Sequence, residues 1–277
     1  MDLGINDIKE ITSAMSDYPD MDYSNYSMSF LKRRLSYAFA LLNLRRLNQL
    51  PERLKDPNFR DKLISNLSVD ATEMFRDPAV WRLIRDKVLS DMPKESEKIW
   101  FPAEANGAEV FSLSIILHES SLTDNYKLIC QSPSIIRCNS INDGAISAGN
   151  NEINQTNYKR LENQNAYNSY FETADGQINL LPYYRRNIEC LNECFLSKPL
   201  AENSAALIMF RNISLYYNHK LTKTAFRLLT KALVKGGYLV IGIKERLPED
   251  LIDEFEVIDA NENIYRKTTT INSRNHA

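Results

Sequence analysis

The second two thirds of the chain alternates short apolar runs with amphipathic segments, and this alternation constrains the fold more than any other feature. Residues 127–132, 205–212 and 236–245 have the composition of buried strands. Residues 107–120 are expected to form a helix, and residues 222–235 an amphipathic helix that ends at Gly236. Strands that alternate with helices favour a mostly parallel sheet with helices on both faces. We therefore predict an α/β fold.

Two segments depart from this alternation. Residues 255–267 contain two short strand-like runs about a turn, which predicts an antiparallel hairpin. Residues from about 150 to 187 are rich in Asn, Tyr and Gln, and Asp175-Gly176 forms a turn signal between strand-like runs. We expect this stretch to be a small antiparallel β insertion.

The first 67 residues have a helical pattern instead. Apolar residues recur at helical spacing from Phe30 onward, and we expect that helix to end at the Leu50-Pro51 step. A shorter helix follows, with Asp56 as its N-cap. The predicted organisation is an N-terminal helical domain at 1–67, a second domain at 68–277 that contains the β insertion at about 150–187, and a disordered tail at 268–277.

Composition narrows the classes of function. The formal net charge of the 277 residues is -2, which gives no reason to expect nucleic acid or a membrane surface as partner. No apolar run is long enough to insert into a membrane, and the start of the sequence is acidic rather than basic. The four cysteines have no C-x-x-C spacing and there are only three histidines, so we expect free thiols, no metal site and a cytoplasmic protein.

Several motifs occur in order along the chain. The segment DATEMFRDPAVW (70–81) is similar to the motif Asn-x-Thr-x-x-Phe-Arg. The segment WFPAEANGAEVFSLSI (100–115) is similar to the glycine-rich loop Trp-Ser-Ala-Gly-Cys-Ser-x-Gly-Glu-Glu-Pro-Tyr-Ser. RNISLYYN (211–218) matches Arg-Asn-x-x-x-Tyr-Phe, and KGGYLVIGIKE (235–245) matches the strand that follows it. On these motifs the chain resembles a divergent member of the CheR-type chemotaxis protein-glutamate O-methyltransferase family.

The resemblance implies a Rossmann-like S-adenosylmethionine-dependent methyltransferase fold with an N-terminal all-helical domain. It also implies methyl transfer from S-adenosylmethionine to glutamate side chains on the coiled coil of a chemoreceptor or sensor kinase. A glutamate carboxylate, with a pKa near ~4.3, is already ionised at neutral pH, so the reaction needs no general base. Its rate would come from orientation of the reacting groups and exclusion of water.

The same resemblance suggests which residues form the site. It places Arg76, Arg211 and Tyr216 beside the reacting groups. The alternative for each of these residues is that it persists for packing alone. The residues that would bind the cofactor are Thr72, Gly107, Glu109, Ser132 and Asn212.

The departures from the family pattern gather on the nucleotide side of the expected site. Ala103 replaces a glycine at the end of the first strand, where a methyl group crowds the loop. Ser132 stands where the family has an acid that holds the ribose hydroxyls, and loss of a charged acceptor costs about 1.5–3 kcal/mol. Cys194-Phe195 stands in place of an Asn-Leu pair that contacts adenine. We therefore expect weakened cofactor binding. Two functions stay open, an enzyme with weak or lost activity and a non-catalytic pseudo-methyltransferase that binds a receptor or sensor.

A basic cluster lies on the first helices. A solvated helix face is the commoner meaning of such a cluster. The resemblance instead implies docking on the acidic coiled coil of a receptor, where charge accelerates encounter more than it adds affinity. The cluster consists of Lys32, Arg33, Arg34, Arg45 and Arg46, and the first three are the predicted partner-binding residues.

Overall fold

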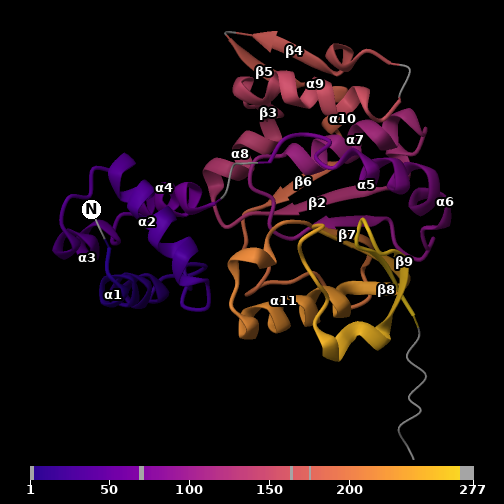
Figure 1. The fold of residues 1–277 in the computed structure, drawn as a ribbon. Helices are drawn as coiled ribbons and strands as arrows, with labels where there is room; N and C mark the ends of the chain where they lie inside the picture. The colour runs from indigo at the N-terminus through magenta and orange to yellow at the C-terminus, as the bar shows by residue number, and fades with distance from the viewer. Residues whose placement is uncertain (1–2, 69–71, 163–164, 175, 269–277) are drawn as a thin grey trace, which may run out of the picture.

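The chain is organised around one mixed sheet of seven strands (Figure 1). The computed structural model describes residues 3–68, 72–162, 165–174 and 176–268. The strand order is β6-β2-β1-β7-β8-β10-β9. The strands are β1 (Lys98–Phe101), β2 (Lys127–Gln131), β6 (Ile188–Leu191), β7 (Ala205–Phe210), β8 (Leu233–Ile241), β9 (Phe255–Asp259) and β10 (Ile264–Lys267).

The pairing directions are those of an α/β fold. Strands β6, β2, β1, β7 and β8 pair in parallel, so that Trp100 of β1 lies beside Ile129 of β2 and Ile208 of β7. Strand β10 pairs antiparallel with both β8 and β9, and these last two strands close the sheet as a hairpin. The predicted mostly parallel sheet and its closing hairpin are therefore confirmed.

Helices cover both faces of the sheet. They are α5 (Pro78–Leu83), α6 (Leu89–Asp91), α7 (Ala108–Glu119), α8 (Ile135–Asp143) and α11 (His219–Ala232). Ile99 and Phe101 of β1 share a buried core with side chains of α5 and α7. Trp100, between them in the strand, packs in a second core with side chains of α11. This division follows from the alternation of side chains along a strand, which sends neighbours to opposite faces.

Helix α11 ends earlier than the sequence indicates. It stops at Ala232, and β8 begins at the next residue. Gly236, the predicted end of the helix, lies inside β8 with a φ of 76°. The prediction was wrong because Leu233 and Val234 are buried, as either an amphipathic helix or a strand would leave them, so the apolar pattern does not mark the change.

The first part of the chain is helical and has a hydrophobic core of its own. Helix α2 ends well before the predicted Leu50-Pro51 step, because Asn43 adopts the left-handed conformation with a φ of 54°. Asp56 caps α4 as predicted. The helices are α1 (Ile5–Ser16), α2 (Met28–Leu41), α3 (Leu50–Arg53) and α4 (Pro57–Leu67).

This helical part lies beside the carboxyl ends of the central strands (Figure 1). Tyr26, which precedes α2, forms an antiparallel bridge with Tyr217, which follows β7. The carboxylate of Asp61 in α4 accepts hydrogen bonds of 2.8 and 3.1 Å from two backbone N–H groups in the first turn of α8. The two parts are thus joined by a backbone bridge and by hydrogen bonds from backbone N–H groups to a side-chain carboxylate. Whether residues 1–67 fold as a domain of their own stays a prediction.

The β insertion is a separate three-stranded antiparallel sheet above the main one (Figure 1). Its order is β3-β5-β4, so the small antiparallel insertion is confirmed, although β3 begins before the predicted start at about 150. Asp175 of the predicted turn and the tail residues 269–277 lie outside the described residues. The elements of this region are β3 (Ala145–Ile146), α9 (Asn151–Lys159), β4 (Phe171–Ala174), β5 (Gln177–Leu180) and α10 (Pro182–Arg185).

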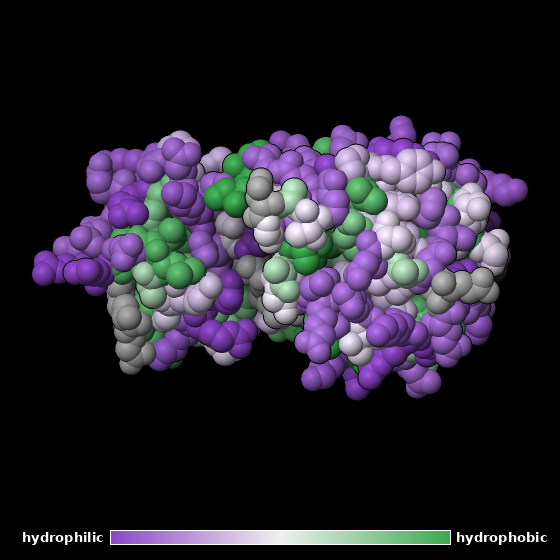
Figure 2. Space-filling view, turned by 90° about the horizontal axis from the view of Figure 1, so that it is seen from above, coloured by the Kyte–Doolittle hydropathy of each residue, from purple (hydrophilic) through white to green (hydrophobic). Residues whose placement is uncertain are grey.

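The surface seen from above the insertion is mostly hydrophilic, with hydrophobic patches on the helical part and beside its junction with the sheet part (Figure 2). Large apolar side chains exposed on the helical part include Ile5, Met28, Tyr37 and Leu41. Across the described ranges, no helix combines the length and the apolar character needed to cross a membrane.

Candidate functional site

A cavity lies at the carboxyl ends of β1, β2 and β7. Its wall contains Phe101 at the end of β1 with residues 102–105 after it, Ser132 and Pro133 after β2, and residues 211–213 after β7. Its volume is about 170 Å³. Open parallel sheets bind ligands at this edge, where the chain switches from building one side of the sheet to building the other.

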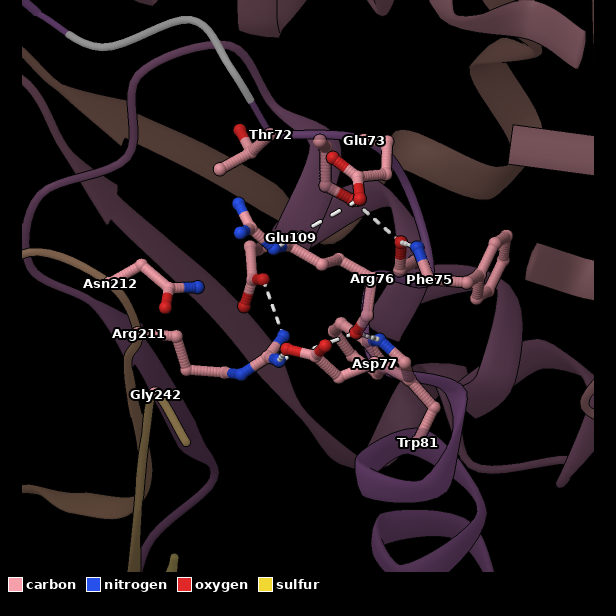
Figure 3. A network of polar contacts seen from close by, with 12 residues as sticks. Thr72, Glu73, Phe75, Arg76, Asp77, Trp81, Glu109, Arg211, Asn212 and Gly242 are labelled. Carbon is pink, nitrogen blue, oxygen red and sulfur yellow. Dashed lines mark hydrogen bonds and ion pairs between the residues drawn. The ribbon is translucent and has the colours of Figure 1, made fainter. Parts of the chain in front are cut away.

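The guanidinium of Arg211 is the centre of the polar wall of this cavity. Its side chain is fully buried, and it donates to Glu109 Oε1 at 2.6 Å and to Asp77 Oδ2 at 2.7 Å. Figure 3 shows the guanidinium pointing at both carboxylates, which come from the start of α7 and from the segment before α5. A buried guanidinium needs such partners, because an unpaired charge away from water is strongly unfavourable.

Three polar atoms around this ion cluster have no partner among the described residues. They are Glu109 Oε2, Arg211 Nε and Asn212 Nδ2, and all three are buried. Burial raises the pKa of Glu109, and the neighbouring charge of Arg211 opposes that rise. Buried polar groups normally have partners. The unsatisfied oxygen and amide therefore point to a polar ligand at this wall of the cavity.

The loop after β7 is held in place by a second buried carboxylate. Glu245 accepts backbone hydrogen bonds of 2.6 to 2.8 Å from Asn212, Ile213, Ser214 and Gly242. A Cβ at Gly242 would lie 2.5 Å from Asn212 Oδ1, so the close approach of β8 to this loop requires glycine. Glu245 thus fixes the position of Asn212 beside the cavity.

The loop after β1 is closed by Glu104. Its Oε1 accepts from the backbone N–H groups of Ala105, Asn106 and Gly107 at 3.1, 3.3 and 3.0 Å. Gly107 has a φ of 80°, and a Cβ there would lie 2.4 Å from the ring of Phe111. Burial, followed by the charge of Glu109, raises the pKa of Glu104 to about 7. Glu104 therefore changes charge near neutral pH.

Seven of the predicted site residues line this one cavity. Gly107 is not in the wall and instead precedes α7 as its N-cap residue, where its left-handed conformation shapes the loop. Ala103 and the Cys194-Phe195 pair also line the cavity. The roles assigned to these residues stay predictions. The seven are Thr72, Arg76, Glu109, Ser132, Arg211, Asn212 and Tyr216.

The predicted partner-binding residues lie on α2, away from the cavity wall. Lys32 and Arg33 are exposed. Arg34 is partly buried and donates to the backbone carbonyls of Leu67 at 3.2 Å and Ser68 at 2.5 Å, and also to that of Asn66. The guanidinium of Arg34 therefore secures the end of α4 within the protein.

Sequence reasoning missed part of the site. Tyr23, Tyr26 and Phe30 of the helical part line the cavity, although no motif pairs them with the sheet. Asp77 pairs with Arg211 across the fold, and only its place next to Arg76 gave a hint. Glu104 follows Ala103 directly, but nothing in the local sequence pattern indicates that its carboxylate accepts hydrogen bonds from the backbone of its own loop.

The sheet order, the closing hairpin and the cavity at the carboxyl edge define the Rossmann-like fold of S-adenosylmethionine-dependent methyltransferases. The family model described as "CheR methyltransferase, SAM binding domain" matches residues 70–264. The chain therefore belongs to the CheR methyltransferase family.

Relatives with similar sequences extend over most of the chain. Cher3 of Pseudomonas putida, described as a methyltransferase, is 27% identical over 254 residues, which cover 89% of this chain and 91% of Cher3. The chemotaxis protein methyltransferase of Listeria monocytogenes is 23% identical over 233 residues, covering 82% and 85%. Among solved structures, the N-methyltransferase NodS of Bradyrhizobium japonicum with S-adenosyl-L-homocysteine has a TM-score of 0.40 at 15% identity, covering 71% of this chain and 89% of NodS.

The cavity fits the cofactor of this family unevenly. The buried Oε2 of Glu109, which lacks a partner, is chemically a suitable acceptor for the ammonium of a methionine group. At the end of β2, Ser132 offers a hydroxyl where an acid would hold a ribose, and Ser132 is itself 1% exposed. The residues thus suit the methionine end better than the ribose end.

Arg211→Met should lower the free energy of unfolding by about 3–5 kcal/mol, because it leaves Glu109 and Asp77 as uncompensated buried charges. Denaturant unfolding of the full chain measures the change. Arg227→Met is the control, because Arg227 is 61% exposed and its ion pair with Asp250 should contribute at most about 1 kcal/mol. Equal losses in the two variants would contradict the importance of the buried cluster.

Glu104 should make the protein less stable as pH rises. The unfolded carboxyl, with an ordinary pKa of 4.5, loses its proton before the folded one, with a pKa of about 7. The free energy of unfolding should therefore fall by up to about 3 kcal/mol between these two pH values. Denaturant midpoints measured against pH for the wild type and Glu104→Gln test this. Parallel pH profiles for the two proteins would show that Glu104 does not titrate in this range.

Proposed function

We propose that the protein is a protein-glutamate O-methyltransferase that binds S-adenosylmethionine weakly and acts on the coiled coil of a chemoreceptor or sensor kinase. Membership of the CheR family supports the reaction class. The observation that carries the proposal is the buried Arg211 cluster, in which Glu109 Oε2 lacks a hydrogen-bond partner although Glu109 lines the cavity. An unsatisfied buried oxygen lowers the stability of the protein. In a protein that binds no ligand, replacing Glu109 by a residue without this oxygen would remove that cost, so the presence of Glu109 supports ligand binding.

Each residue of the wall has a role in this proposal. Bound S-adenosylmethionine supplies the activated methyl group. Glu109 accepts from the ammonium of its methionine part, and Arg211 holds Glu109 in place. Arg76, whose side chain is 35% exposed at the cavity, attracts the substrate carboxylate. Tyr216 packs against Phe30, with ring centroids 4.7 Å apart, and excludes water from the reacting groups.

The reaction needs no proton acceptor in the protein. The substrate glutamate is ionised at neutral pH, so its carboxylate oxygen would bond directly to the methyl carbon as the sulfur–methyl bond breaks, with neutral S-adenosylhomocysteine as the leaving group. The protein contributes alignment of that oxygen with the methyl group and a site from which water is removed. This agrees with the cavity wall, where the two acids, Glu104 and Glu109, are both held by hydrogen bonds.

Weak cofactor binding follows from the nucleotide side of the cavity. Ser132 replaces an acid that would accept from the ribose, which lowers affinity by about tenfold to a hundredfold. The cavity of about 170 Å³ is also below the range of about 300–1,000 Å³ that is usual for ligands of this size. Binding would therefore require Phe30 or its aromatic neighbours to move.

A second candidate is a non-catalytic module that keeps the fold and binds a sensor. The aromatic wall of Tyr23, Tyr26 and Phe30 favours it, because these side chains make the cavity small. In this case the cavity would no longer bind the cofactor, and the surface of the helical part would bind the sensor.

Ser132→Asp should tighten the binding of S-adenosylhomocysteine by about tenfold to a hundredfold, because it restores an acidic acceptor at the end of β2. Calorimetric titration of the full chain measures both affinities. Ser121→Asp is the control, because it adds the same charge at an exposed residue beyond the end of α7. A micromolar dissociation constant for the wild type would contradict weak binding. Absence of methyl transfer by Ser132→Asp at saturating cofactor would favour the second candidate.

We also propose that the exposed face of α2 docks on an acidic coiled coil. Lys32 and Arg33 supply positive charge, and Tyr37 and Leu41 are exposed apolar side chains of the same helix. An apolar surface flanked by basic residues suits an acidic amphipathic helix. Arg34 is not part of this surface, because it holds the end of α4.

Reversal of Lys32 and Arg33 to Glu should abolish co-purification with a receptor or sensor coiled coil at low salt, with no loss of stability, since both residues are exposed. The control reverses Lys94 and Lys98, which are exposed near the amino end of β1, opposite the cavity. Co-purification that survives the first reversal, or that the control reversal also abolishes, would remove α2 as the docking face.

A further inference from the structure

Glu104 stands at an unusual position for an acid. In the glycine-rich loop pattern that the chain resembles, this position is a cysteine. The residue is only 7% exposed, and it lines the cavity together with Glu109 and Ser132. A buried carboxylate is unfavourable without partners, so its presence in the wall requires an explanation.

The loop holds only one of the two carboxylate oxygens of Glu104. All three backbone N–H groups that it binds donate to Oε1. In the described part of the chain, Oε2 has no hydrogen bond and is not among the buried atoms that lack a partner. Because Oε1 is fixed by three donors, the orientation of the group is fixed as well. Oε2 is thus a positioned acceptor in a residue of the cavity wall.

Glu104 also lies next to the missing acid. Its backbone N–H donates to the carbonyl of Gln131 at 3.1 Å, and Gln131 immediately precedes Ser132 in the chain. The loop after β1 and the end of β2 therefore meet at these residues. One acid is lost at position 132 and one is gained at position 104, next to it in the cavity wall.

We propose that Glu104 replaces the lost acid of β2 and accepts hydrogen bonds from the ribose hydroxyls of the adenosyl cofactor through Oε2. The inference rests on the proposed function and identifies the residue that supplies its remaining affinity. Glu104 is then a cofactor-binding residue peculiar to this chain. In this proposal the acid that binds the ribose has moved from position 132 to position 104. The loop can therefore differ from the family pattern at Ala103 and Glu104 while the Arg211 cluster is retained.

The charge of Glu104 depends on the groups around it. Burial and then the charge of Glu109 in α7 raise its pKa, and hydrogen bonds from the loop lower it. The thiols of Cys130 in β2 and Cys190 in β6 also interact with it, and Arg76 and Arg211 line the same cavity. Binding is best measured at about pH 8, where a carboxyl with a pKa of about 7 is mostly ionised.

Glu104→Gln is the decisive variant, because its amide oxygen can still accept from the three loop N–H groups while the charge is removed. Calorimetry of the full chain with S-adenosylhomocysteine should show affinity lowered by about tenfold or more. Glu104→Gln with Ser132→Asp should recover at least the wild-type affinity. Glu52→Gln is the control of equal charge change, because Glu52 is 78% exposed in α3. Its affinity should equal that of the wild type.

Binding of adenosine, which has the ribose hydroxyls, can be compared with binding of 2′,3′-dideoxyadenosine, which lacks them. The comparison distinguishes a direct contact of Glu104 with the hydroxyls from an indirect effect on the conformation of the loop. Glu104→Gln should weaken adenosine by a similar factor and leave the dideoxy compound unchanged, because only the former has the hydroxyls. Equal weakening of both would overturn the inference. Unchanged or tighter binding of S-adenosylhomocysteine by Glu104→Gln would also overturn the inference. It would show that Glu104 only stabilises the conformation of the loop.

The inference and the proposed function can fail separately. A weak site would have a dissociation constant of about 1 mM. If the wild-type protein does not bind S-adenosylhomocysteine even at about 10 mM, the role of Glu104 is overturned. Binding that depends on Glu104 without any methyl transfer to a glutamate-bearing coiled coil would overturn the proposed activity alone.

Discussion

The buried charge of Arg211 is the constraint on which the arrangement of the site depends. A guanidinium with no exposed surface at the end of β7 must be neutralised by acids that come from elsewhere in the chain. Asp77 brings the segment before α5 to this point, and Glu109 brings the first turn of α7. Three segments far apart in sequence are thereby held at one edge of the sheet.

Around this cluster, carboxylates hold loops by accepting backbone N–H groups. Glu245 does so for the loop after β7 and Glu104 for the loop after β1. Both side chains are almost completely buried. Backbone held in this way has little freedom to adjust, so the geometry of the polar wall is set before a ligand arrives. The aromatic wall opposite, from Tyr23 to Phe30, is tied to the loop after β7 by the backbone bridge between Tyr26 and Tyr217.

The sequence predicted the sheet because its strands are short, apolar and separated by helices, and β7 and β8 show this most clearly. It placed Thr72, Glu109 and Arg211 in one site because each belongs to a motif. It failed where tertiary contact decides. Local sequence pattern does not reveal that Asp77 forms an ion pair with Arg211 or that Tyr26 pairs with Tyr217. It also does not reveal that helix α2 ends before Asn43.

The bridge between Tyr26 and Tyr217 bears on how such proteins diversify. If recombination exchanged the amino-terminal segment for that of a homologue, it would replace one wall of the cavity together with the surface of α2. The docking face proposed for α2 and the shape of the cavity would be inherited as a single unit. Lineages that acquire a new amino-terminal segment would then have to re-evolve the matching side chains around Tyr217.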